Sequence, residues 1–156
     1  MAKERPTGLL RLLFRAPVWL YRARLGFLLG SRFLMIEHRG RSSGRLYRTV
    51  VEVVGRPGSA GEEWLVVSGF GPRTDWYRNL REGGLVAIWL GSRRCHATAR
   101  FVEPEEAAGI MLAYETEHPT AAGVLQRELG LTHDGTAEGR VELMSQIPMV
   151  GFTSEC

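Results

Sequence analysis

Six short segments rich in β-branched and aromatic residues limit what this chain can fold into. They read RFLMIEH, YRTVVEVVG, WLVVSG, LVAIWL, CHATARFV and IPMVGFT, with glycine-containing turns such as GRPGSAGEE between them. Neighbouring segments separated by such turns pair as antiparallel hairpins. Six short strands are too few for two well-packed sheets, so the pattern predicts an α+β fold built on a small antiparallel barrel.

Helices are expected around this barrel. Residues 76–82 can form a short helix capped by Asp75 and ended by Gly83 and Gly84. Residues 104–118 begin with proline and two glutamates, which suit a helix N-terminus through the fixed φ of proline and through the helix dipole. Residues 119–130 are expected to form another helix, and the pattern assigns no element to residues 131–146.

The basic excess of the chain lies at its N-terminus. Up to Arg32 there are seven basic residues and one acidic residue, whereas the remainder has thirteen basic and sixteen acidic residues. Residues 1–30 show the pattern of a basic amphipathic helix interrupted near Pro17, without the apolar centre and cleavage site of a secretory signal. The longest uncharged stretch is far below the roughly 20 residues that span a bilayer. Two roles stay open for this arm, a lid over the mouth of the domain or a helix on an anionic membrane surface.

The remaining residues, 31–156, are expected to form one domain without disulfides or metal. Cys95 and Cys156 lie far apart and form no C-x-x-C motif, and the four histidines never fall at ligand spacing with one another or with a cysteine. A reducing cytoplasm is therefore the expected compartment. Nucleic acid is not an expected partner, because acidic residues outnumber basic ones beyond the arm.

The turn between the first two expected strands, HRGRSSGRLYRT (38–49), carries four arginines, two glycines and two serines. Glycines permit positive φ, and guanidinium groups can donate two parallel hydrogen bonds to phosphate or carboxylate. Because side chains alternate between the faces of a strand, only some of these arginines can converge. On chemistry alone, an anion site and a solvated loop are equally supported, and the spacing is not that of a P-loop.

A second cluster, SGFGPRTDWYRNL (68–80), places a serine at the end of a buried strand and two glycines where a ligand could approach the backbone. Trp76 and Asn79 lie three residues apart and can share one helix face. A flat conjugated ring could rest here with an anionic tail directed to the arginines. Trp76 could instead be a plug of the barrel. Ser68 does not lie in a G-x-S-x-G motif, so a hydrolase is not supported.

The combination GRSSGRLYRT, VVSGFG and DWYRNL, in this order, resembles the deazaflavin-dependent nitroreductase family of split β-barrel oxidoreductases. This family is related to flavin-binding proteins of the pyridoxamine-phosphate-oxidase type. The likeness runs from about Phe33 to Val102, with weaker similarity in IPMV. It implies a split barrel with flanking helices and binding of the reduced coenzyme F420, whose phosphate and oligoglutamate tail are anionic; FMN is the less favoured cofactor.

The resemblance also implies a set of cofactor-binding residues. They are Gly40, Arg41, Ser42, Ser43, Gly44 and Arg48 in the phosphate turn, Ser68 and Gly69 beside the ring, and Trp76, Tyr77 and Asn79 in the W-Y-x-N-L motif. Ser68 is also the candidate catalytic residue, through a hydrogen bond to the ring or to the substrate. The chain departs from the family at Ser42, where a lysine or arginine is frequent, and in its C-terminal helices, which offer only Tyr114 where nitroreductases have several tyrosines.

The implied activity is hydride transfer between the deazaflavin and a hydrophobic acceptor such as a quinone or an unsaturated compound. Activity on nitroaromatic compounds does not follow, because the substrate-side tyrosines are missing. Two alternatives stay open, a lipid or fatty-acid carrier on the same barrel and a relative that binds FMN or haem. The expected location is the cytoplasm, with the inner face of the membrane as an alternative through the arm, and the oligomeric state stays open.

Overall fold

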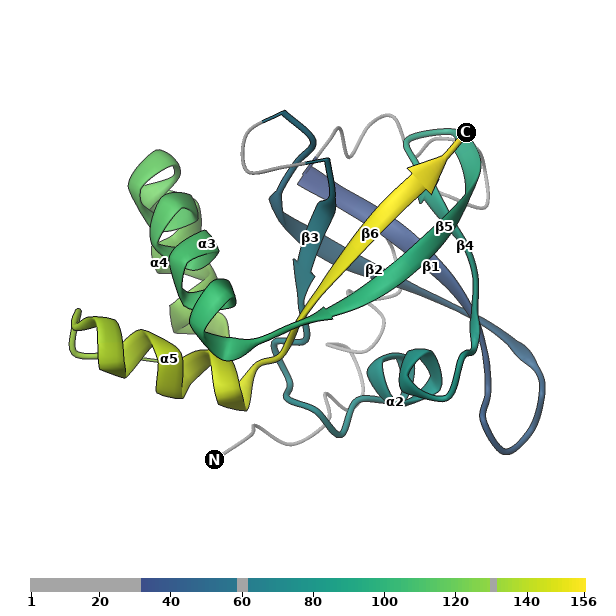
Figure 1. The fold of residues 1–156 in the computed structure, drawn as a ribbon, viewed down its shortest axis with the longest axis horizontal. Coiled ribbons are helices and arrows are strands. Elements are labelled where there is room, and N and C mark those ends of the chain that lie inside the picture. The colour runs from purple at the N-terminus through teal and green to yellow at the C-terminus, as the bar shows by residue number, and fades with distance from the viewer. Residues whose placement is uncertain (1–31, 59–61, 130–131) are drawn as a thin grey trace.

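A computed structural model describes residues 32–58, 62–129 and 132–156, in which six strands form a closed antiparallel barrel (Figure 1). Around the barrel the order is β1-β2-β3-β6-β5-β4. The strands are β1 (Phe33–Arg39), β2 (Leu46–Gly55), β3 (Trp64–Val67), β4 (Leu85–Leu90), β5 (Arg93–Val102) and β6 (Met149–Glu155). The predicted small antiparallel barrel is thus confirmed, and the arm predicted for residues 1–30 lies outside the described residues.

The barrel interior is filled by apolar side chains from all of its walls. Alternate residues of β1 point inward, and the same holds for the facing strands, as the period of two requires. Fully buried members of this core are Leu34, Ile36, Val66, Ile88, Val150 and Phe152. Because the sheet closes on itself, each of the six strands has a neighbour on both sides.

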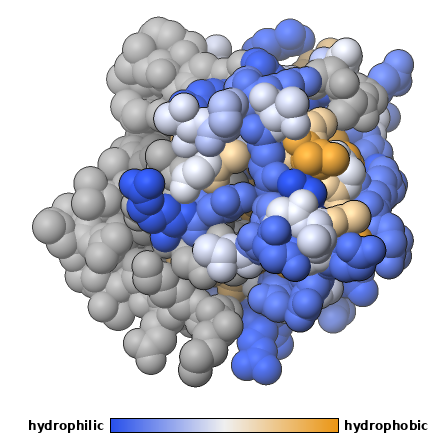
Figure 2. Space-filling model, turned by 90° about the vertical axis from the view of Figure 1, so that its left-hand side faces the viewer, coloured by the Kyte–Doolittle hydropathy of each residue, from blue (hydrophilic) through white to orange (hydrophobic). Residues whose placement is uncertain are grey.

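Four helices accompany the barrel in the described residues: α2 (Asp75–Arg81), α3 (Pro104–Glu117), α4 (Pro119–Leu129) and α5 (Ala137–Gln146). The helix α2 lies at one end of the barrel, whereas α3, α4 and α5 form a separate group beside it (Figure 1). A second apolar core joins α3 and α5 to side chains of β2, β3 and β6, such as Val54, Leu65 and Met149. The outer side of this helical group is mostly hydrophilic, with a small apolar area (Figure 2).

The helix α5 was missed by the sequence pattern. Its N-cap is Thr136, whose side chain accepts a hydrogen bond from Gly139 N. Few of its residues are apolar, so the helical period is weak, and its position depends on packing against α3. Glu115 of α3 contributes to this packing by accepting hydrogen bonds from His133 (2.8 Å) and Arg140 (3.1 Å). Such contacts between distant segments leave little trace in the local sequence.

The cap of α2 also differs from expectation. The helix begins at Asp75, and its N-cap is Thr74, which makes no side-chain capping bond. The Thr74 hydroxyl instead hydrogen-bonds to Ser68 Oγ at 2.7 Å. The start of α2 is therefore tied to the loop that precedes it.

No helix in the described ranges is long and apolar enough to cross a membrane.

A disulfide joins Cys95 and Cys156, so the expectation of unpaired cysteines is wrong. The reason is strand register: β5 and β6 are antiparallel, and His96 faces Glu155. The two cysteines that flank this pair therefore meet, with their Cα atoms 4.6 Å apart, although 61 residues separate them in the sequence. The distance along the chain carried no information about this pairing.

Replacing Cys156 with serine is expected to lower the free energy of unfolding by about 2–4 kcal/mol, because the cross-link restricts a long loop in the unfolded chain. Urea denaturation of wild type and variant measures the difference. Wild type treated with a reductant is the matched control and should unfold like the untreated variant. A reductant that leaves the wild-type transition unchanged would show that the cysteines are not bonded.

Candidate functional site

The arginine turn is a compact hairpin loop between β1 and β2. Gly40 N donates to Arg45 O (2.8 Å), and Gly44 N donates to Gly40 O (2.9 Å). Gly44 has a φ of +67°, which favours glycine, and a Cβ on Gly40 would lie 2.5 Å from Ser43 Oγ. Ser43 Oγ is itself 3.2 Å from the Tyr47 hydroxyl. Gly44 is thus favoured by its backbone conformation and Gly40 by the close approach of two side chains, while Ser42 is exposed at the tip.

The turn is docked onto α2 through Asn79. Its Oδ1 accepts hydrogen bonds from Arg41 N (3.0 Å) and from Arg41 Nη1 (2.9 Å). Arg41 Nη2 lies 3.3 Å from Asp75 Oδ1, at the start of the same helix. The two motifs singled out in the sequence, residues 38–49 and 68–80, are therefore in contact at one end of the barrel.

Behind Asn79 lies a buried histidine to which the sequence had assigned no role. Asn79 Nδ2 donates to His38 Nδ1 (3.0 Å), and His38 Nε2 is 3.1 Å from Thr49 Oγ1. Burial lowers the pKa of His38 to about 4, although nearby Asp75 acts in the opposite direction. The sequence carried little signal for this residue, because His38 lies between two other polar residues at the end of β1.

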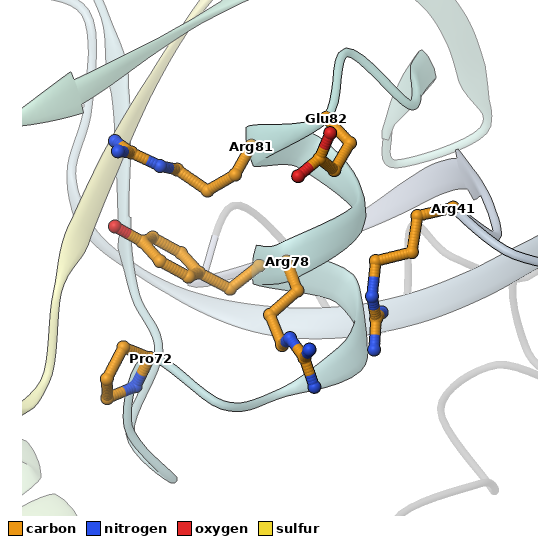
Figure 3. A pocket seen from close by; sticks show the side chains of 6 residues that line it. Arg41, Pro72, Arg78, Arg81 and Glu82 are labelled. Atoms are coloured by element: carbon orange, nitrogen blue, oxygen red, sulfur yellow. The ribbon is translucent and has the colours of Figure 1, made fainter.

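A groove of about 400 Å³ lies between the turn and α2, with the lining residues Arg41, Pro72, Tyr77, Arg78, Arg81 and Glu82. The side chains of Arg41 and Arg78 extend in the same direction, while that of Arg81 points away from them (Figure 3). The Arg81 guanidinium also stands 4.7 Å above the ring of Phe101. Three guanidinium groups against one carboxylate make this lining suited to an anion.

Arg48 does not line this groove. Its Nε donates to Glu37 Oε1 (3.0 Å), which also accepts from Trp89 Nε1 (2.9 Å), while Arg94 Nε donates to Glu37 Oε2 (2.9 Å). Glu37 faces Arg48 across the β1–β2 pair, on the opposite side of β1 from the inward-pointing Ile36. Arg48 is therefore held on the barrel wall by Glu37, and its predicted role in binding phosphate together with Arg41 stays a prediction.

Ser68 and Trp76 lie inside the fold rather than in the groove. The Ser68 hydroxyl donates to Gly71 O (2.7 Å), its backbone N donates to Pro148 O (2.8 Å), and its neighbour Gly69 is half-buried. Trp76 is 7% exposed and belongs to the barrel core. Tyr77 lines the groove and contacts Phe101 edge to face, with ring centres 5.6 Å apart. The cofactor roles of Ser68, Gly69 and Trp76 stay predictions.

A small antiparallel barrel with a cationic groove at one end is suited to binding an anionic cofactor. The family model described as F420H(2)-dependent quinone reductase matches residues 13–127, and the chain belongs to this family. The protein is thus an F420H2-dependent reductase whose cofactor is coenzyme F420, as the motifs had implied. The family name gives quinone-type small molecules as the substrate class.

Solved structures show the same fold at low identity. One, described as the structure of an F420-H2 dependent reductase (FDR-A), is 19% identical, covers 78% of this chain and 93% of its own, and has a TM-score of 0.50. Another, described as a domain-swapped dimer, is 18% identical, covers 87% and 98%, and also has a TM-score of 0.50. No curated protein matches the sequence.

The donor set fits the anionic part of the coenzyme. The three arginines of the groove are suited to the phosphate and to the carboxylates of the oligoglutamate tail. Arg41 in addition presents its side chain from a backbone that Asn79 holds in place. The residues present therefore agree with the cofactor that the family implies.

Proposed function

We propose that this protein reduces quinones with a hydride from F420 and that the anionic part of the coenzyme lies in the arginine groove. The observation that supports this placement most directly is the fixed position of Arg41. Its backbone N and its Nη1 both donate to Asn79 Oδ1, so the guanidinium stands at the groove wall before a ligand arrives. A group held in this way loses little side-chain entropy when it binds a phosphate or carboxylate.

The chain's own residues would bind, orient and shield the reactants. The bound coenzyme supplies a hydride, which requires no nucleophile or metal of the protein. We place its ring against the backbone at Gly69 and beside Tyr77, as the family motifs imply. Ser68 is then a positioning residue, because its hydroxyl is engaged by Gly71 and Thr74 and holds the loop of residues 68–74 in shape.

For residues 1–30 we propose a role in the access of hydrophobic acceptors. A basic amphipathic segment suits a lid at the barrel mouth and also suits contact with an anionic surface at the cytoplasmic face of a membrane. In both cases the acceptor side of the reaction is affected. Among the described residues the groove is lined by side chains from 41–82, so this proposal leaves the affinity for F420 to the turn and α2.

The placement predicts that Arg41→Ala weakens F420 binding by about 1.5–3 kcal/mol, because charged hydrogen bonds are lost. The loss should shrink as salt rises. Fluorescence titration of oxidised F420 into the purified protein measures both effects. Arg48→Ala should have a smaller effect, because Arg48 is paired with Glu37.

Arg45→Ala is the matched control, since Arg45 is exposed on the same turn and its removal changes the net charge equally. If Arg41→Ala and Arg45→Ala weaken binding to the same small extent, the groove attracts F420 only through its overall charge. Unchanged affinity in Arg41→Ala would exclude this groove as the anion site.

A further inference from the structure

A buried polar chain runs from the barrel to the anion groove. It consists of Thr49, His38, Asn79 and Arg41, joined by the successive hydrogen bonds described above. His38 and Asn79 are each 2% exposed, so water cannot replace their partners. The donors of His38 and Asn79 therefore depend on the protein for their acceptors.

The orientation of the Asn79 amide is determined by its neighbours. Arg41 N and Arg41 Nη1 are both donors, and both point at the same amide atom, which must be the oxygen. The amide nitrogen then faces His38 Nδ1 at 3.0 Å. Because Nδ2 can only donate, His38 Nδ1 must be the acceptor and carries no proton.

The histidine is thereby fixed as one tautomer. Its proton lies on Nε2, which donates to Thr49 Oγ1 at 3.1 Å. The aromatic ring of Tyr47 stacks on the imidazole, with ring centres 5.9 Å apart. Asp75 on α2 is the carboxylate whose charge reaches His38, and its effect on the histidine is smaller than that of burial.

The opposite amide orientation would be unfavourable at both ends. It would direct Nδ2 at two donors of Arg41 and would leave Oδ1 facing His38 Nδ1, an acceptor. If His38 offered no acceptor, however, the buried Nδ2 would have no partner in the observed orientation, which is unfavourable. The amide would then gain by moving away, and Arg41 would lose the oxygen that holds it.

We propose that His38 is a positioning residue of the F420 site: by accepting a hydrogen bond from Asn79, it holds the amide oxygen against Arg41 and keeps that guanidinium at the groove wall. This inference rests on the proposed function, because Arg41 is the residue assigned to the anion. His38 does not line the groove and acts on the coenzyme only through Asn79 and Arg41.

Three substitutions of His38 test this role. Asparagine can place an acceptor oxygen where Nδ1 stands, glutamine reaches instead toward the position of Nε2, and leucine offers no acceptor. We expect His38→Leu and His38→Gln to weaken F420 binding about tenfold, the equivalent of one hydrogen bond, and His38→Asn to restore most of the affinity. Fluorescence titration of oxidised F420 gives the affinities, and urea denaturation of each variant gives its stability.

Thr49→Val is the matched control on the other side of the ring. It removes the acceptor for Nε2 but leaves the Nδ1 bond to Asn79, so stability should fall while F420 affinity is kept. If Thr49→Val and His38→Leu lower the affinity equally, His38 is only a structural residue. Equal affinities of His38→Asn and His38→Gln lead to the same conclusion, even if His38→Leu fails to fold.

A double-mutant cycle separates this inference from the proposed function. In the Arg41→Ala background, His38→Gln should have no further effect on F420 affinity, because the group that it positions is gone. A full additional loss in that background would refute the positioning role. If Arg41→Ala alone leaves the affinity unchanged, the proposed groove is wrong, whereas a loss with Arg41→Ala but none with His38→Gln overturns only the role of His38.

Discussion

Trp76→Ala is expected to lower the free energy of unfolding by about 3–5 kcal/mol, as is usual for truncation of a buried aromatic side chain. Trp76 comes from α2, which lies at one barrel end, and packs in the barrel core together with Leu80. A closed sheet cannot contract around the cavity, because each strand is hydrogen-bonded on both sides. Urea denaturation of wild type and variant measures the loss.

The same variant decides between the two roles predicted for Trp76. If the indole is mainly a plug of the barrel, stability falls more than F420 affinity does, which is the result that its burial favours. Thermal melts with and without F420 separate these effects, since at one ligand concentration a more tightly bound ligand raises the transition temperature further. Trp76→Phe, which keeps a ring in the core, is the control. Lost binding with unchanged stability would place the indole beside the coenzyme.

Glu37→Ala should also have a large effect, about 3 kcal/mol on the free energy of unfolding, since one member of a buried ionic cluster is removed. Trp89 and two arginines lose their acceptor in this variant. The expected loss lies at the lower end of the range for broken buried ion pairs, because both arginines are partly exposed. Glu63→Ala is the matched control. Its Arg100 partner lies at the surface, and such a pair contributes about 1 kcal/mol or less. Equal losses from the two variants would contradict this account.

Glu37 also makes stability depend on pH. Burial by itself raises the pKa of this carboxyl, but hydrogen bonds from Trp89, Arg94 and Arg48 outweigh it and hold the pKa below its ordinary value. A carboxyl with a lowered pKa stabilises the fold above the pKa that it has in the unfolded chain. This contribution is lost as pH falls through the lower pKa of the folded state. As pH falls below about 4.3, the free energy of unfolding should therefore decrease more for wild type than for Glu37→Gln. Urea denaturation at a series of pH values measures both, and parallel pH dependences of the two proteins would contradict the assignment.

The strands could be predicted from the sequence because their signal is local. Segments such as LVAIWL and WLVVSG carry the composition and length of buried strands, and the turns between them are rich in glycine. The closure of the barrel by β6 against β3 and β5 involves pairings between distant segments. The Cys95–Cys156 bond depends on that register, and so it was missed.

The candidate site was predictable in part. The motifs indicated that residues 38–49 and 68–80 belong to one site, and the contact between Arg41 and Asn79 agrees with this. Which arginine turns toward the groove depends on neighbours that the turn itself does not contain. Glu37 holds Arg48 at the barrel wall through a hydrogen bond. The Glu37 carboxylate is in turn held by hydrogen bonds from Trp89 and Arg94, on two later strands.

The position of β6 in the barrel affects how the protein folds during translation. This strand is Met149–Glu155, next to the C-terminal residue, yet it lies between β3 and β5. While the chain is being translated, β3 and β5 have no partner on their facing sides, and the apolar core between them is open to solvent. The barrel can close only after residues 149–155 have been synthesised, so this slow, non-local pairing step comes late in folding. A nascent chain stalled before β6 would thus expose two unpaired strand edges, which is where chaperone binding would protect it.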